Sequence, residues 1–270
     1  MNRVISALLF SLLLSPLALQ AAGFDFSGYA ALLDRYVVAD QSVDSIPLNA
    51  VDYERWAREQ ALPGSAYRKL LGNLAGFDPA SLEGKDERLA FWINVYNIAA
   101  IKTLLDHYPV ESIRSRRINW LGQPWTRETI RVGGQPFSLN EIEFDILIEG
   151  LRDLRAHLAI NCASVSCADL RPEPYRAEAL GLQLREQGER LAAQPEKGLR
   201  IDRAARRVSV SQIFKFDRKH FDAWTGGPVA FLIPYVTDPV DRAFLEAGDY
   251  TLEYLDYDWS ANDLKWVDQR

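Results

Sequence analysis

Two cysteines and one histidine lie close together near the middle of the sequence. The spacing is His157-x4-Cys162-x4-Cys167, and the chain of 270 residues has no other cysteine. Neighbouring cysteines can form a disulfide that closes a tight loop, or a redox-active or nucleophilic thiol pair. A metal site is the third interpretation, and it needs a fourth ligand, for which Asp169 or Glu173 is available. The residues alone leave these three interpretations open.

The element that carries Cys162 decides how a thiol at this position would be presented. The apolar residues 157–161 predict a short buried strand that ends at Cys162, and prolines within residues 164–175 predict a loop after it. Nucleophiles often lie where a rigid element opens into a loop. His157 and Cys162 would face opposite sides of such a strand unless a bulge intervenes, so His107 and His220 are alternative partners.

Residues 87–107 predict the strongest single element, a helix that is apolar on every face and therefore buried at the centre of the fold. Asp86 is the expected N-cap, and Glu87 suits the first turn. Asn94 and Asn97 share one face of this helix. Because buried amides must be hydrogen-bonded, we expect them to tether a loop or a strand.

The remaining patterns predict scattered hairpins and grouped helices, which indicates an α+β fold in one domain, with the central helix packed on a small, mainly antiparallel sheet. Residues 24–75 read as helical with Asn49 as a cap, and Ser138 with Glu141 forms a capping-box candidate. The expected elements after residue 75 are hairpins over 125–139 and 199–211, helices over 177–193, 228–236 and 239–247, a short amphipathic segment over 213–222 and a strand over 250–257.

Acidic residues give weaker signals. Glu141, Glu143 and Asp145 are most simply a solvated helix face, and the cluster around Tyr257 (residues 256–259, DYDW) could line a cleft or cap the last strand. The chain has no phosphate loop, no dinucleotide fingerprint, no Gly-x-Ser-x-Gly elbow and no His-Glu-x-x-His motif. The sequence therefore indicates no cofactor.

The first residues predict a secretory signal peptide. Arg3 precedes an apolar run over residues 4–14, and Leu19 and Ala21 fit the −3 and −1 positions of a cleavage site. We expect a signal peptide over 1–21, a mature domain over 22–270 without a transmembrane segment, and a periplasmic or secreted location. The net charge of −6 at pH 7 argues against a nucleic-acid partner.

Four blocks resemble the domain-of-unknown-function 547 family, and with the leader they indicate an exported bacterial member. The blocks are residues 89–97 (LAFWINVYN), 157–167 (HLAINCASVSC) followed by 170–172 (LRP), 211–215 (SQIFK) and 257–260 (YDWS). The resemblance extends from about residue 60 to 262. It implies a fold like that of papain-type and transglutaminase-type thiol enzymes. The residues that it implicates are Asn94, Asn97, Glu143, His157, Cys162 and Cys167.

The chain departs from the family pattern at two positions. Phe144 stands where a histidine often follows the acid, and Ala168 stands where a proline often follows the second cysteine. If the missing histidine were the family's base, this chain would be inactive or would use His157.

The first functional hypothesis is a thiol-dependent hydrolase or transferase. Cys162 would be the nucleophile, His157 the base, and Glu143 or Asn94 the group that orients the base. The substrate would be a peptide or amide, or a small thiol such as glutathione.

The second hypothesis is a non-enzymatic periplasmic protein that binds a small molecule, a peptide or a partner. In this case a disulfide between Cys162 and Cys167 would shape the ligand loop. The contact residues would then be Trp120, Trp125 and Trp259. The sequence specifies neither the ligand nor the oligomeric state.

Overall fold

A computed structural model describes residues 23–121 and 123–267 of the chain. The predicted signal peptide lies outside this range. The fold is α+β, as expected. The α-helices are α1 (Ser27–Tyr36), α2 (Tyr53–Gln60), α3 (Ala66–Gly76), α4 (Lys85–Leu105), α5 (Leu180–Ala192), α6 (Ile213–Phe216), α7 (Arg218–Thr225), α8 (Pro228–Leu232) and α9 (Pro239–Ala247). The strands are β1 (Val37–Val43), β2 (Ile46–Val51), β3 (Glu128–Val132), β4 (Gln135–Ser138), β5 (Leu199–Asp202), β6 (Arg207–Val210) and β7 (Thr251–Tyr254).

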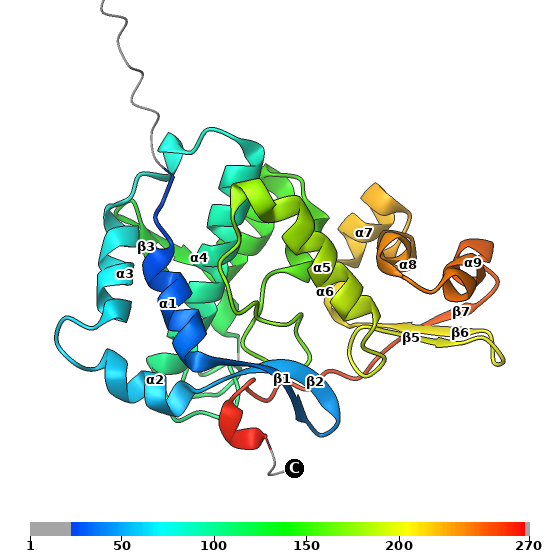
Figure 1. Ribbon diagram of the computed structural model, residues 1–270, viewed down its shortest axis with the longest axis horizontal. Coiled ribbons are helices and arrows are strands. Elements are labelled where there is room, and N and C mark those ends of the chain that lie inside the picture. Colours follow the sequence, from blue (N-terminus) through cyan, green and yellow to red (C-terminus); the bar gives the residue numbers. More distant parts are fainter. Residues whose placement is uncertain (1–22, 122, 268–270) are drawn as a thin grey trace, which may run out of the picture.

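Helix α4 is the centre of the fold. Helices α1 to α3 lie at one end of the molecule, and α7 to α9 with β5 to β7 lie at the other (Figure 1). Nearly every α4 residue from Leu89 onward is buried, which confirms the predicted central helix. The predicted N-cap is wrong, because Gly84 occupies that position and Asp86 lies in the first turn. Among the described residues, no helix has both the length and the apolar content that crossing a membrane requires.

The sheet structure is divided into three small sheets. Strands β1 and β2 form an antiparallel pair, as do β3 and β4, and the third sheet has the order β5-β6-β7 with β7 parallel to β6. The predicted hairpins over 125–139 and 199–211 are confirmed, and so is a strand within 250–257. Gly133 needs its positive φ of 57° and its missing side chain, because a Cβ there would lie 3.0 Å from the Phe77 carbonyl oxygen.

The helical prediction for residues 24–75 is wrong in its middle. Strands β1 and β2 separate α1 from α2, and the chain turns between them at Asp44 and Ser45, both with positive φ. The β-branched residues of this segment favour strands locally, and the helical spacing before and after it concealed the change of period. Asn49 is not a helix cap, since it lies in β2, and Asp52 caps α2 instead.

The strand predicted over residues 157–161 is also wrong. A short 3-10 helix, η4 (Leu154–Leu158), leads into irregular chain, so Cys162 does not follow a strand. Asn97 on α4 takes the place of a neighbouring strand: its Nδ2 donates to the Ala159 carbonyl (3.0 Å), and its Oδ1 accepts from the Asn161 amide (2.8 Å). A short buried apolar run has the same composition in either structure, which explains the error.

The last part of the chain returns to the cysteine loop. After β7 it runs along the loop, with single-residue antiparallel bridges from Ser260 to Ser112 and from Ala261 to Ser164. These contacts fix Tyr257 and Trp259 beside the cysteines, although the two segments lie more than 90 residues apart in sequence.

Candidate functional site

A pocket of about 370 Å³ brings together most of the residues that the sequence motifs singled out. Its walls are largely aromatic, and the rings of Trp125 and Tyr257 contact Trp259 with centroids 5.3 and 4.4 Å apart. The lining residues are Tyr96, Arg114, Gln123, Trp125, Asn140, Glu143, Phe144, His157, Ile160, Cys162, Cys167, Ile213, Phe216, Tyr257 and Trp259.

The two cysteines face each other in this pocket. Both are free and buried, and their Sγ atoms lie 2.6 Å apart. The backbone amide of Cys162 donates to Sγ of Cys167 at 3.0 Å. The sulfur of Cys167 therefore accepts from the Cys162 amide, and either sulfur of the pair can donate to the other.

Two hydroxyl groups complete the surroundings of the sulfur atoms. The hydroxyl of Tyr257 lies 3.3 Å from each Sγ, and the hydroxyl of Ser164 lies 3.1 Å from Sγ of Cys162. These two hydroxyls are themselves 3.0 Å apart. Hydroxyl donors of this kind stabilise a thiolate more than a thiol.

The hydrogen bonds shift the pKa values of the two cysteines in opposite directions. Burial raises the pKa of Cys167, but donors from Cys162, Tyr257 and Ser164 lower it to about 7. Burial and the adjacent Cys167 sulfur raise the pKa of Cys162 well above its usual value. Burial and the two sulfurs likewise raise the pKa of Tyr257, so its hydroxyl stays a donor. These hydrogen bonds favour a thiolate at Cys167 over one at Cys162.

The loop between the cysteines is held by side-chain amides. Asn161 Oδ1 accepts from the amide of Ala163 at 2.8 Å, and Asn161 Nδ2 donates to the carbonyl of Ala168 at 2.7 Å. Ala163 has a φ of 60°, a left-handed conformation that is unfavourable for alanine. Strained backbone of this kind persists where the surroundings fix it, and it is frequent at functional sites.

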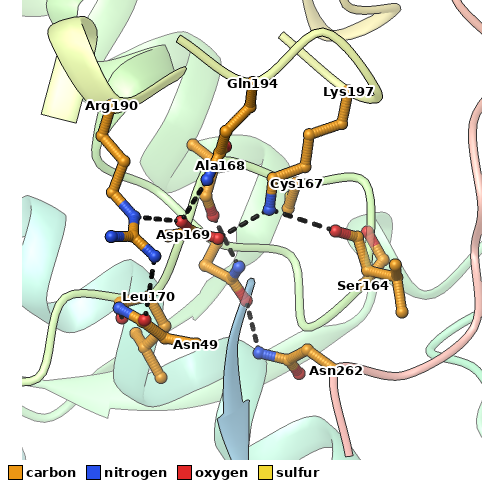
Figure 2. Close-up of polar contacts among 12 residues, drawn as sticks. Asn49, Ser164, Cys167, Ala168, Asp169, Leu170, Arg190, Gln194, Lys197 and Asn262 are labelled. Carbon is orange, nitrogen blue, oxygen red and sulfur yellow. Dashed lines mark hydrogen bonds and ion pairs between the residues drawn. The ribbon is translucent and has the colours of Figure 1, made fainter. Parts of the chain in front are cut away.

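A buried ionic cluster anchors the other side of the loop, centred on Asp169 (Figure 2). Its carboxylate accepts from Lys197 Nζ at 2.6 Å, from Gln194 Nε2 at 3.0 Å and from Arg190 Nε. Lys197 Nζ also lies 3.4 Å from the Val165 carbonyl, between the two cysteines. Burial raises the pKa of Asp169, but these partners lower it below its ordinary value.

The two acids considered as metal ligands are engaged elsewhere. Asp169 belongs to the buried cluster, and Glu173 pairs with Arg171. Within residues 23–121 and 123–267, no three His, Cys, Asp or Glu side chains are arranged to hold a metal ion.

His157 lines the same pocket but is bonded to acids. Its Nε2 lies 2.9 Å from Asp217 Oδ2, and its Nδ1 lies 3.6 Å from Glu143 Oε1. The described part of the chain has no hydrogen bond between His157 and either cysteine. The Tyr96 hydroxyl donates to Glu143 Oε2 at 3.1 Å.

Glu143 differs from the solvated residue that its helix pattern suggested. It belongs to η3 (Glu141–Gly150), a π-helix that begins with the predicted capping box, because Ser138 and Glu141 exchange both expected hydrogen bonds. Burial raises the pKa of Glu143, against the opposing effects of His157 and the Tyr96 hydrogen bond, and the charge of Asp217 raises it further.

The two asparagines have structural contacts. Both polar atoms of Asn94 bond the backbone of Tyr175, and both polar atoms of Asn97 bond the segment before Cys162. This confirms that they tether a loop. Neither lines the pocket. In the described part of the chain both polar atoms of Asn94 bond Tyr175 and not His157, so its orienting role stays a prediction.

Several pocket residues belong to segments that the sequence patterns indicated only in part. Trp125 and Trp259 line the pocket as expected, whereas Trp120 is exposed (78 %) and does not. The cluster 256–259 was a cleft candidate, and its Tyr257 contacts both sulfurs. No sequence pattern marked Asp217 as a site residue, because an isolated aspartate between two short helices resembles an ordinary helix cap.

Comparison with known proteins supports one assignment. Residues 79–191 match the family described as protein of unknown function, DUF547. The matched range includes α4, Glu143, His157 and both cysteines, whereas the blocks 211–215 and 257–260 lie beyond it. No curated protein matches the chain, and no solved structure does. Residues 79–191 of this chain are thus a DUF547 family domain.

Proposed function

We propose that the protein is a thiol-dependent enzyme that exchanges thiols and disulfides with a small substrate in the aromatic pocket. The observation that carries the proposal is the pair of sulfur atoms 2.6 Å apart in the pocket wall. Adjacent cysteines of unequal acidity are what a dithiol–disulfide couple requires, since one must attack as a thiolate and the other must follow.

The reaction has two steps. The Cys167 thiolate attacks one sulfur of a substrate disulfide, a mixed disulfide forms, and the other substrate sulfur leaves with the electron pair of the broken bond. Cys162 then gives its proton to solvent water and attacks the Cys167 sulfur, which closes the Cys162–Cys167 bond. The second substrate sulfur leaves with the electron pair of the mixed disulfide. The substrate disulfide gains two electrons and the protein dithiol loses them. A small thiol of the glutathione class would reduce the protein again.

The pocket favours a small substrate with an apolar part and a negative charge. Both cysteines are buried, so a folded protein disulfide would not reach them. Aromatic walls suit an apolar group. Arg114 supplies a cation, with its guanidinium 5.0 Å from the ring of Trp259.

Alkylation against pH tests the proposal. We expect iodoacetamide to label one cysteine of the reduced protein with a midpoint near 7, the value to which its hydrogen bonds lower the pKa of Cys167. Cys162→Ser should keep a labelled thiol, and Cys167→Ser should move the midpoint upward. A wild-type midpoint near about 8.5, as for a free cysteine, would overturn the proposal.

The ease with which small thiols reduce the oxidised protein distinguishes an exchange enzyme from a binding protein. A disulfide that small thiols reduce readily supports exchange chemistry. A bond that resists them would favour the alternative of a periplasmic binding protein whose disulfide shapes the ligand loop.

Acyl transfer is the second candidate, and the observation that favours it is the presence of His157 and Glu143 in the same pocket as the cysteines. The implied likeness to papain-type and transglutaminase-type folds belongs to this candidate. It requires His157 to approach Cys162 when substrate binds. Release of acid from a thioester or amide, with no net oxidation of the thiols, would establish it over exchange.

We also propose that the chain works outside the cytoplasm, on the basis of the leader pattern over residues 1–21. N-terminal sequencing of the native protein should begin at Ala22. A sequence that begins at Met1 in protein recovered from the cytosol would overturn this proposal.

A further inference from the structure

Five titratable side chains form a continuous series of contacts from the pocket to the protein surface. Glu143 and His157 line the pocket. Beyond His157, one oxygen of Asp217 lies 2.9 Å from its Nε2, and the other lies 2.5 Å from Nδ1 of His220. His220 Nε2 lies 2.6 Å from Glu149 Oε1. Asp217 is fully buried, whereas Glu149 is about half exposed (49 %).

Burying this series of charged groups lowers the stability of the fold, which points to a role for it in the site. Burying charged groups is unfavourable, and apolar side chains would fill the same space at less cost. A carboxylate only accepts hydrogen bonds, so Asp217 takes one N–H from each imidazole. The Nε2 proton of His157 is then fixed, and its Nδ1 is left facing Glu143.

We propose that Glu143 is the general acid of the pocket, and that Asp217 and His220 are positioning residues that hold His157 against it and connect it to Glu149 at the surface. The proposal rests on the proposed exchange reaction. When Cys167 attacks a disulfide, the leaving sulfur departs as a thiolate. Glu143 gives its proton to that sulfur, and the product leaves as a thiol. The carboxylate then recovers a proton from water, directly or by transfer along the series that leads through His157 to Glu149.

The groups around Glu143 suit this role. Tyr96 faces it from α4, His157 from η4 and Asp217 from the junction of α6 and α7. Burial and the charge of Asp217 raise the pKa of Glu143, which favours the protonated form that a general acid needs.

The outer end of the series carries further charges. Lys219 Nζ lies 3.9 Å from Glu149, and the Arg152 guanidinium lies 4.2 Å from the ring of Trp224, which contacts His220. Lys219 thus lies beside Glu149, and Arg152 lies beside Trp224, so both cations stand at the outer end of the series. At the inner end, burial raises the pKa of Glu143, His157 and the Tyr96 hydrogen bond oppose this, and the charge of Asp217 raises it further.

Two disulfide substrates test the inner end. An alkyl disulfide releases a basic thiolate that benefits from an acid, whereas an aryl disulfide releases a stable thiolate that does not. In Asp217→Asn the lost negative charge should move the high-pH fall in the alkyl rate to lower pH, and the aryl rate should stay within about twofold. Glu246→Gln, on exposed α9, is the control and should change neither rate. Equal changes for both substrates, or none, would overturn the proposal.

A second measurement does not depend on the reaction. Glu149→Gln alters a half-exposed side chain, so the fold should survive. We expect the imidazole nitrogen resonances of both His220 and His157 to change in this variant. His107 bonds the Thr103 carbonyl, outside this series, and serves as an internal reference. A change confined to His220 would disprove the connection. If neither disulfide reacts with the wild type, the exchange function fails, while the resonances still decide whether the series is coupled.

Discussion

The ammonium group of Lys197 lies 2.6 Å from the carboxylate of Asp169, and both side chains are buried. Asp169 lies two residues after Cys167, and Lys197 also reaches the Val165 carbonyl within the cysteine loop. Burial lowers the pKa of Lys197, against the opposing effects of the charge and hydrogen bond of Asp169 and of the nearby Cys167 sulfur. The ion pair thus links helix α5 and the turn after it to the backbone that carries the two thiols.

Lys197→Met should destabilise the protein strongly. Removing one partner of a buried ion pair leaves an uncompensated charge, so we expect the free energy of unfolding to fall by about 3 kcal/mol or more. Urea denaturation measures this change. Arg206→Met, which removes one partner of the exposed pair with Asp249, should cost less than about 1 kcal/mol. A cost as small for Lys197→Met would mean that Arg190 and Gln194 satisfy Asp169 without it.

Tyr257→Phe should make the thiol pair less acidic. The tyrosine hydroxyl lies 3.3 Å from both sulfurs, and a hydrogen bond to a charged group contributes about 1.5 kcal/mol, or about one pH unit. The midpoint of alkylation should therefore rise by about one unit above the wild-type value. Tyr250→Phe, at a tyrosine without a contact to the cysteines, should leave it unchanged. An unchanged alkylation midpoint in Tyr257→Phe would show that this hydroxyl does not stabilise the thiolate.

Asn97→Ala should destabilise the segment before Cys162. The substitution leaves the Ala159 carbonyl and the Asn161 amide buried without partners, and each such group costs about 1–3 kcal/mol. We expect a loss of about 3 kcal/mol in the free energy of unfolding. Asn73→Ala, on the exposed face of α3, should stay within about 0.5 kcal/mol of the wild type. Equal stability of the two variants would show that Asn97 does not hold this segment.

The role of Asn97 also shows how far the sequence could predict the fold. The apolar surface of α4, the Gly133-Gly134 turn and the Ser138–Glu141 capping box are local patterns, and all three are present as expected. The segment before Cys162 has no neighbouring strand, because an amide from α4 satisfies its backbone. This amide belongs to Asn97, about 60 residues away in sequence, so no local sequence pattern could predict the contact.

The same distinction applies to the site. The cysteines, His157 and Glu143 stood out by residue type and by resemblance, and they do share one pocket. Asp217 lies 60 residues from His157, and Tyr257 lies 95 residues from Cys162. The C-terminal segment reaches the cysteines through Tyr257, and the junction of α6 and α7 reaches His157 through Asp217, so tertiary packing brings these residues together.

Glu143→Gln should stabilise the protein at neutral pH and lose this advantage in acid. Burial raises the pKa of Glu143 in the folded state, so folding favours its protonated form. Between its unfolded and folded pKa values Glu143 must bind a proton on folding, and above the folded pKa the wild type must bury a charge. Below about pH 4, where the unfolded chain is also protonated, this cost disappears. Glutamine is neutral throughout and can still accept from Tyr96. Urea denaturation at several pH values measures the difference.

Glu141→Gln is the control of opposite sign. Because Ser138 lowers the pKa of Glu141, this variant should be less stable than the wild type at neutral pH, and the difference should vanish in acid. If the stability difference between Glu143→Gln and the wild type does not depend on pH, Glu143 is as readily ionised in the folded chain as in the unfolded one. Glu143 could then not serve as the protonated acid of the pocket.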